Sequence, residues 1–334
     1  MKRLAGTAVV LGMLGLATAF VLWVVPAEEF IFAPGDPKPL DDKVEVENAR
    51  PPAEGAVYYV DVLVRRTSRL EDLLPFLRPE GSTVVPEEAL LPPGTSEQDR
   101  DRQTTAQMER SELVASAVAL RELGYDVRAT PRGALVIDVA VGVPAARKLE
   151  SGDVVVAVDG APIRTPAQLR REIGRRRPGE DVEFTVQRNG ETVSVVVRTL
   201  AHPAEPERPI VGISVDQQAD IDLPLDVEID LGSVGGPSAG LPFALQIARM
   251  LGKDVTHGCE VAATGELALD GSVLTVGGLK QKTIGARREG VDVFLVPVGP
   301  NAEDARANAK DMEIVPVESF QQALRLLTTN PRMC

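Results

Sequence analysis

The sequence is poor in the residues on which most hydrolytic and metal chemistry depends. Its 334 residues include only two histidines and two cysteines. The cysteines, Cys259 and Cys334, are too few for a disulfide framework, and neither has metal-ligand neighbours. A Ser-His-Asp hydrolase would have to use His202, in a proline-rich connector, or His257, which precedes a glycine. Neither position favours a rigid base, and Cys259, in an apolar stretch, is expected in the core. We expect no metal and no cofactor.

Positive charge is also scarce. Asp and Glu number 49 against 36 Lys and Arg, which gives a net charge of −13. A nucleic-acid partner needs a basic face, so none is expected. The arginines of 170–177 are interpreted as the solvated side of one helix. The chain also lacks a Gly-x-x-x-x-Gly-Lys-Ser/Thr phosphate loop.

The N-terminal segment contains the longest apolar run. Lys2 and Arg3 precede uncharged residues from Leu4 to Val25, which would form a helix about 33 Å long. This order predicts a transmembrane anchor over residues 1–26, with a cytoplasmic N-terminus and the remainder outside the cytoplasmic membrane. The alternative is a signal peptide cleaved after residues 17–19 (Ala-Thr-Ala), although the apolar run continues past that site.

Composition and periodicity divide the rest of the chain. Residues 27–54, rich in proline and acidic residues, are predicted to be a linker. In residues 55–124 we expect a strand over 56–64, a loop over 92–107 and a helix capped by Ser111. Residues 125–200 alternate like a small β-rich module. Residues 205–330, beginning with a strand over 210–215, indicate an α/β domain. The predicted fold class is therefore α+β.

The β-rich module contains glycine-bearing turn motifs in a fixed order. Val143-Pro144-Ala145-Ala146 precedes Leu149-Glu150-Ser151-Gly152-Asp153 and, after a strand, Asp159-Gly160. This pattern resembles bacterial PDZ domains, which bind an extended peptide as an added strand. The resemblance implies a peptide groove between the strand over 134–139 and the helix over 166–173.

A glycine turn follows the strand predicted over 226–230. It is Gly235-Gly236-Pro237-Ser238-Ala239-Gly240, and an apolar helix is expected from residue 241. Glycines let a backbone approach a substrate closely, and free N–H groups at a helix start can stabilise an oxyanion. Taken alone, such a serine is more often an ordinary helix cap than a nucleophile.

Two later motifs extend this pattern. Thr264-Gly265-Glu266 and Gly277-Gly278-Leu279-Lys280-Gln281-Lys282 follow in order, up to Ala286. Together with the glycine turn they resemble the proteolytic domain of the Lon family. The resemblance implies that Ser238 is the nucleophile and Lys282 its base, with Thr264, Gly236 and Pro237 in support and Lys280 a surface charge. A lysine can act as that base only if burial lowers its pKa.

The whole arrangement resembles the bacterial membrane-anchored, PDZ-containing Lon-like serine proteases. It implies an ATP-independent endopeptidase that cleaves unfolded or exposed polypeptides outside the cytoplasmic membrane, and the resemblance to Lon proteases implies a ring of six. Residues 55–124 would then be the first part of the protease domain, with the PDZ domain inserted after it. One departure is Asn301-Ala302, where this subgroup usually has cysteine in place of the alanine. The alternative function is a membrane adaptor or scaffold with a catalytically silent protease-like domain.

Overall fold

The computed structural model describes residues 2–50, 54–91, 96–232 and 234–330, which form two compact units. The larger unit comprises the chain up to Leu123, Leu225–Leu267 and the chain from Gly271. The smaller unit comprises Gly124–Pro224 with Ala268–Asp270. Residues before and after the smaller unit thus build one body.

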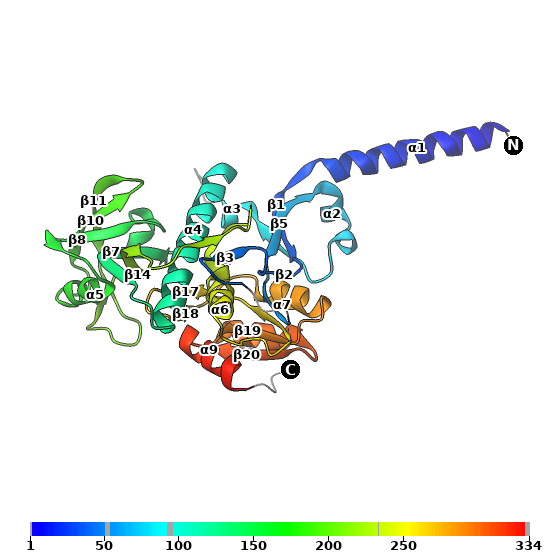
Figure 1. Cartoon of the computed structure of the whole chain (residues 1–334). Coiled ribbons are helices and arrows are strands. Elements are labelled where there is room, and N and C mark those ends of the chain that lie inside the picture. The colour runs from blue at the N-terminus through cyan, green and yellow to red at the C-terminus, as the bar shows by residue number, and fades with distance from the viewer. Residues whose placement is uncertain (1, 51–53, 92–95, 233, 331–334) are drawn as a thin grey trace. The chain divides into compact units, whose positions relative to one another are not determined.

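The N-terminal segment forms helix α1 (Lys2–Val24), shown in dark blue in Figure 1. Across the described part of the chain, no helix combines the length and apolar character needed to cross a membrane. The predicted transmembrane helix is therefore not confirmed.

The segment 27–54 is not the linker that its composition predicted. It contains strands β1 (Pro26–Pro34), β2 (Lys38–Pro39) and β3 (Val44–Val46). Its apolar residues Ile31, Leu40 and Val44 are at most 1% exposed. Prolines at the ends of β1 and in the short β2 are compatible with strand positions that need no backbone donor, which is why a proline-rich composition misled the prediction.

Two larger sheets organise the larger unit. One has the order β5–β1–β6, with β5 at Val62–Ser68 and β6 at Thr83–Pro86. The other has the order β2–β4–β16–β19–β20, in which only β2 is antiparallel to its neighbour. Its remaining strands are β4 (Ala56–Tyr59), β16 (Glu260–Ala263), β19 (Val293–Pro297) and β20 (Glu313–Val317). The single strand predicted over 56–64 is therefore two strands in different sheets, β4 and β5, separated at Val60-Asp61.

Two short pairs complete the strands of this unit: β15 (Val227–Ile229) with β3, and β17 (Glu266–Leu267) with β18 (Val273–Leu274). Its other described α-helices are α2 (Arg69–Leu73), α3 (Glu87–Leu90), α4 (Glu97–Glu122), α6 (Gly240–Met250), α7 (Leu279–Arg288), α8 (Pro300–Ala309) and α9 (Phe320–Thr329). Helix α4 begins within the predicted loop 92–107, and Ser111 is an interior residue of it. Helix α4 lies beside α6, although the smaller unit separates them in sequence (Figure 1).

The core of the larger unit fixes α7 in place. Leu279 and Ala286, one on each end turn of α7, pack in a buried cluster with Val60, Phe294 and Val296. Strand β19 is buried along its whole length, as expected for a parallel strand covered on both faces. Helix α7 is thereby held against the sheet by apolar burial.

The smaller unit is built around a six-stranded sheet and an α-helix. The order is β11–β10–β8–β7–β14, with β9 (Ala161–Pro162) paired to β8. The strands are β7 (Arg128–Val139), β8 (Val154–Val158), β10 (Asp181–Arg188), β11 (Glu191–Arg198) and β14 (Ile213–Asp222), and the helix is α5 (Pro166–Gly174). Positive φ at Asn189 and Gly190 forms the tight β10–β11 turn that this dipeptide favours.

Strand β14 corrects a predicted boundary. Residues 210–215 were expected to open the α/β domain after residue 205. Instead β13 (Pro209–Ile210) pairs with β12 (Leu200–Ala201), and β14 pairs along β7. The smaller unit therefore continues to Pro224. The apolar pattern of this strand does not specify which sheet it joins.

Cys259 differs from its expected role as a small core residue. It is only partly buried and is disulfide-bonded. The chain's other cysteine, Cys334, lies outside the described residues.

Candidate active site

Ser238 lies on a one-turn 3-10 helix, Pro237–Ala239, that leads directly into α6. Gly236 precedes it with φ +96°, a conformation that side chains with a Cβ avoid. The Gly236 N–H donates to the Thr104 carbonyl at 2.8 Å, and Ser111 Oγ donates to the Pro237 carbonyl at 3.0 Å. Both partners are on α4, so α4 holds the turn from one side.

Lys282 reaches the same turn from the first part of α7. Its Nζ donates to Ser238 Oγ at 2.6 Å and to Thr264 Oγ1 at 2.9 Å. The residue is 3% exposed, whereas Lys280 is exposed. The structure thus brings Lys282 rather than Lys280 to the serine, although only Gln281 separates the two lysines in the sequence.

Thr264 connects the serine turn to the central sheet. It follows β16, and its N–H donates to the Leu295 carbonyl at 3.0 Å. Its hydroxyl donates to the Ser238 carbonyl at 3.2 Å while accepting from Lys282. The neighbouring Gly265 N–H also donates to the Ser238 carbonyl, at 2.9 Å. Thr264 therefore fixes both the lysine and the serine backbone.

Burial controls the charge of Lys282. Desolvation lowers its pKa from 10.5 to about 7, because a buried ammonium loses its hydration. The Asp61 carboxylate opposes this by favouring the charged form. Lys282 therefore titrates near neutral pH, whereas an exposed lysine is almost fully protonated there.

The backbone before α7 is held by a buried asparagine. Asn301 accepts from the Val276 N–H at 2.8 Å and donates to the Val276 carbonyl at 3.0 Å. Ala302, the residue that replaces the cysteine usual in the resembling subgroup, is buried in the core. The substitution at residue 302 therefore affects packing behind the site.

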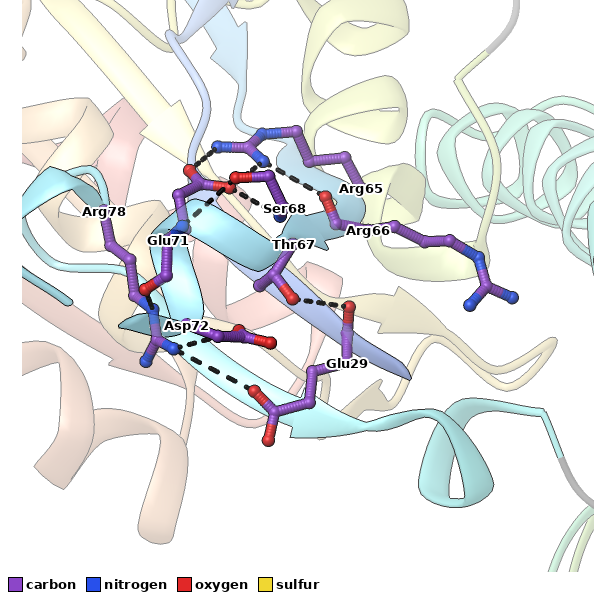
Figure 2. A network of polar contacts seen from close by, with 8 residues as sticks. All are labelled: Glu29, Arg65, Arg66, Thr67, Ser68, Glu71, Asp72 and Arg78. Carbon is purple, nitrogen blue, oxygen red and sulfur yellow. Dashed lines mark hydrogen bonds and ion pairs between the residues drawn. The ribbon is translucent and has the colours of Figure 1, made fainter. Parts of the chain in front are cut away.

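A network of polar contacts holds the strand that follows Asp61 (Figure 2). Arg65 forms two hydrogen bonds to the Glu71 carboxylate, at 2.6 and 2.9 Å. Glu71 and Ser68 cap α2 reciprocally, at 2.9 and 3.2 Å. The Arg65 contacts, followed by the capping bond, lower the Glu71 pKa to about 2. Arg78 then ties this region to Glu29 of β1 at 4.0 Å. The network fixes β5 and α2 against β1.

Sequence reasoning missed Thr104, Ser111 and Asp61 as neighbours of the site. Their contacts join segments far apart in the chain, and no local motif marks them. Neither histidine takes part in the serine–lysine cluster: His202 accepts from the Ala204 N–H, and His257 contacts the Leu327 carbonyl at 2.8 Å. Among the residues that the structure describes, no group of three or more His, Cys, Asp and Glu could hold a metal ion.

A second candidate site lies on the edge of the smaller unit. The groove expected beside residues 134–139 is not available, because β7 already pairs with β8 on one side and β14 on the other. One edge of this sheet is β14 and the other is β11, and α5 packs against β14 and β7. Gln217 of β14 donates to the Arg164 carbonyl at 2.8 Å, just before α5. An added peptide strand would therefore pair with β14.

Two family models match the chain. Residues 121–199 match the PDZ domain, and residues 213–330 match the Lon protease (S16) C-terminal proteolytic domain. The second match contains Ser238, Thr264 and Lys282. The chain therefore combines a PDZ domain with a Lon-type proteolytic domain. The second match begins with β14, which belongs to the smaller unit, and continues through the larger unit.

Curated relatives agree with the second match. The chain is 42% identical over 91 residues to the Lon protease of Mesomycoplasma hyopneumoniae, which covers 26% of this chain and 10% of that protein. It is 35% identical over 113 residues to the Lon protease of Desulforamulus reducens, covering 33% and 13%. For the Lon protease of Xanthomonas oryzae the values are 36% over 125 residues, 36% and 14%. The chain thus spans less than a sixth of these relatives.

Solved structures are also similar to a part of the chain. The PDZ domain of the SdrC-like protein from Listeria monocytogenes is 22% identical, with a TM-score of 0.25, covering 26% of this chain and 92% of that one. The solution structure of GtR34C from Geobacillus thermodenitrificans is 29% identical, with a TM-score of 0.23, covering 25% and 95%.

Proposed function

We propose that the protein is an ATP-independent serine endopeptidase in which Ser238 is the nucleophile and Lys282 the general base. The carrying observation is the 2.6 Å contact between Lys282 Nζ and Ser238 Oγ, made by a buried lysine whose pKa is lowered to about 7. A nucleophile within hydrogen-bond reach of a base, itself oriented by Thr264, is the arrangement that covalent catalysis requires.

The reaction follows from this geometry. Neutral Lys282 takes the proton of Ser238 as Oγ attacks the peptide carbonyl carbon. The resulting ammonium returns that proton to the leaving amine, and the C–N bond breaks to give an acyl-enzyme. Lys282 then deprotonates a water, which attacks the ester carbon and releases the acid product and the Ser238 hydroxyl. The N–H groups at the start of α6 are not free for the oxyanion, because the Gly240 N–H donates to the Pro237 carbonyl and the Leu241 N–H to the Gly265 carbonyl at 3.0 Å, and residue 242 is a proline.

The substrate class follows from the second site. An extended peptide added to β14 would hold a polypeptide for cleavage by the same chain. Cleavage of unfolded or exposed segments is proposed because this sequence has no phosphate loop to power unfolding. Adding ATP should therefore leave the rate unchanged.

The test is the cleavage of an unfolded protein by the full chain, Ser238→Ala and Lys282→Ala. We expect cleavage only by the unsubstituted protein, and covalent labelling of Ser238 by a fluorophosphonate. Equal cleavage by all three proteins would refute the serine–lysine mechanism. Peptide binding with no cleavage and no labelling would favour the scaffold.

Location and assembly are further parts of the proposal. Lys2 and Arg3 before the apolar run favour a catalytic domain outside the cytoplasmic membrane. The disulfide bond of Cys259 adds support, since disulfides persist in oxidising compartments. Thiol alkylation of protein isolated from cells without reductant should leave Cys259 unmodified. Light scattering of the purified protein tests the ring of six that the Lon resemblance implies.

A further inference from the structure

The side chain of Asp61 is 13% exposed, and its two carboxylate oxygens lie in different environments. Its Oδ2 accepts from Lys38 Nζ at 2.8 Å. Its Oδ1 is fully buried and accepts no hydrogen bond from any residue that the structure describes. Leaving a buried charged oxygen without a partner costs free energy, so such a group calls for a physical explanation.

The chain around Asp61 packs on both sides of Lys282. A Cβ added to Gly278, at the N-terminus of α7, would lie 2.7 Å from Val62 Cγ2. Seven residues further along, in the second half of α7, a Cβ on Gly285 would lie 3.6 Å from Val60 Cγ1 and would overlap the Gly35 carbonyl. Lys282 lies between these two glycines, four residues after Gly278 and three before Gly285.

Gly35 completes the packing. A side chain at Gly35 would overlap Asp61 Oδ1, so the carboxylate occupies the space that the glycine leaves. Gly35 in turn lies against Gly285 of α7. The two glycines thus allow Asp61 to approach the helix that carries the lysine.

We propose that Asp61 and Lys38 form an electrostatic control of the Ser238–Lys282 pair, in which Asp61 favours the protonated lysine and Lys38 limits that effect. This inference rests on the proposed function of the pair. Asp61 touches neither substrate nor serine and acts through Lys282. The direction of its effect agrees with the pKa of Lys282, which burial lowers and Asp61 raises.

Lys38 is placed to vary the strength of this control. Its side chain is half exposed, whereas that of Asp61 is mostly buried. Its ammonium lies 5.8 Å from the centre of the Tyr59 ring. The pKa of Lys38 is raised. Its hydrogen bond to Asp61 is the largest cause, burial opposes it by lowering the pKa, and the charges of Asp61, Tyr59 and Asp36 raise it further. Lys38 therefore stays charged at neutral pH and offsets part of the Asp61 charge.

Other charged groups on the elements packed against α7 have partners of their own or face solvent. Glu29 of β1 pairs with Arg78, and Arg287 of α7 donates to the Asn308 carbonyl at 2.8 Å. Lys280 is exposed. The charged residues of α8 are exposed too: Glu303, Asp304 and Arg306. The charge of Asp61 is the one that raises the pKa of Lys282 against the effect of burial.

The test compares the pH dependence of peptide cleavage in Asp61→Asn and Lys38→Met. Asp61→Asn should move the midpoint of the acidic limb to lower pH by about one unit, a typical effect of a nearby opposite charge. Lys38→Met should move it to higher pH, because the Asp61 charge is then no longer offset. The exposed neighbouring pair supplies matched controls, Asp42→Asn and Lys43→Met, which should shift neither way.

Opposite shifts in the two variants support the proposal. Shifts of the same sign, no shift, or equal shifts in the controls overturn it. Should Asp61→Asn fail to fold, Lys38→Met and its control carry the test. A titration of the Lys282 side chain by NMR in Ser238→Ala separates the two proposals: it measures the effect of Lys38 on Lys282 even if Ser238 proves not to be the nucleophile.

Discussion

Ser111 Oγ donates a hydrogen bond to the Pro237 carbonyl, 3.0 Å away and 126 positions further along the chain. Ser111 belongs to α4, before the smaller unit, and Pro237 to the serine turn after it. The contact shows that the turn depends on sequence that precedes the PDZ domain. A Cβ at Gly240 would lie 3.0 Å from the same hydroxyl, so the approach of α6 to α4 is close.

The first prediction concerns this contact. Ser111→Ala leaves the Pro237 carbonyl without its donor and loosens the turn, so kcat should fall about tenfold with little change in KM. Ser116→Ala is the matched control: it is another buried serine of α4, but it donates within the helix to the Glu112 carbonyl at 2.8 Å. Equal activity of both variants would show that the Ser111 contact is dispensable.

The second prediction concerns pH. The base form of Lys282 is neutral, and its pKa is about 7. Activity should therefore fall about tenfold per pH unit below 7 and reach a plateau above it. Rates of a peptide substrate without titrating side chains, measured from pH 5 to 9, check this. A constant rate across pH 7 would mean that Lys282 is not the base.

The third prediction separates stability from activity. The folded pKa of Lys282 is lowered below 10.5, so the unfolded chain binds more protons between about pH 7 and 10.5. Stability from this group therefore rises with pH across that window, and the burial cost is fully present below pH 7. Lys282→Met should remove that cost and raise the free energy of unfolding at pH 7 by on the order of 3 kcal/mol, while abolishing cleavage. Urea unfolding measures it, and a destabilised Met variant would contradict it.

The fourth prediction concerns Thr264. Thr264→Val keeps the shape of the side chain but removes the hydroxyl oxygen that accepts the hydrogen bond from Lys282 Nζ. We expect kcat to fall by about 10- to 100-fold. Thr264→Ser restores the hydroxyl and should retain most activity. If Thr264→Val cleaves as fast as Thr264→Ser, the hydroxyl does not orient the lysine.

Local motifs predicted the residues of the site better than their surroundings. The glycine turn was visible in the sequence itself, whereas Thr264 and the choice of Lys282 over Lys280 came from the resemblance of the motifs to those of the Lon family. Thr104, Ser111 and Asp61 were not, because each acts across more than a hundred residues and carries no motif. Their identity depends on which helices and strands become neighbours.

Errors in the fold had a related cause. The composition of 27–54 predicted a tether, but short β-strands need few apolar residues when each one is buried. The pattern of 56–64 indicated one strand, whereas the chain changes sheets at Val60-Asp61. Residues 210–215 were predicted to be one strand of the α/β domain, whereas the structure divides them between β13 and β14 with a break at Val211-Gly212. Strand β14 pairs with β7 of the smaller unit, since alternation does not identify a strand's partner.

The last prediction tests whether 27–54 belongs to the folded body. Arg249 of α6 is 1% exposed and bonds the Asp41 carboxylate and the Gly55 carbonyl. Arg249→Met removes these bonds, leaving the Asp41 carboxylate with the Gln246 side chain as donor at 3.1 Å, and should lower the free energy of unfolding by about 3 kcal/mol. Lys253→Met, an exposed cation just after α6, should change it by less than about 0.5 kcal/mol.

Truncation gives the stronger form of this test. A chain starting at residue 27 should fold and cleave peptides. A chain starting at residue 55 lacks Ile31, Leu40 and Val44, whose burial contributes about 2 kcal/mol each. That loss of about 6 kcal/mol is comparable to the whole stability of an ordinary domain, so we expect no cooperative unfolding and no activity. A shorter chain that unfolds cooperatively and cleaves like the longer one would show that 27–54 is a tether after all.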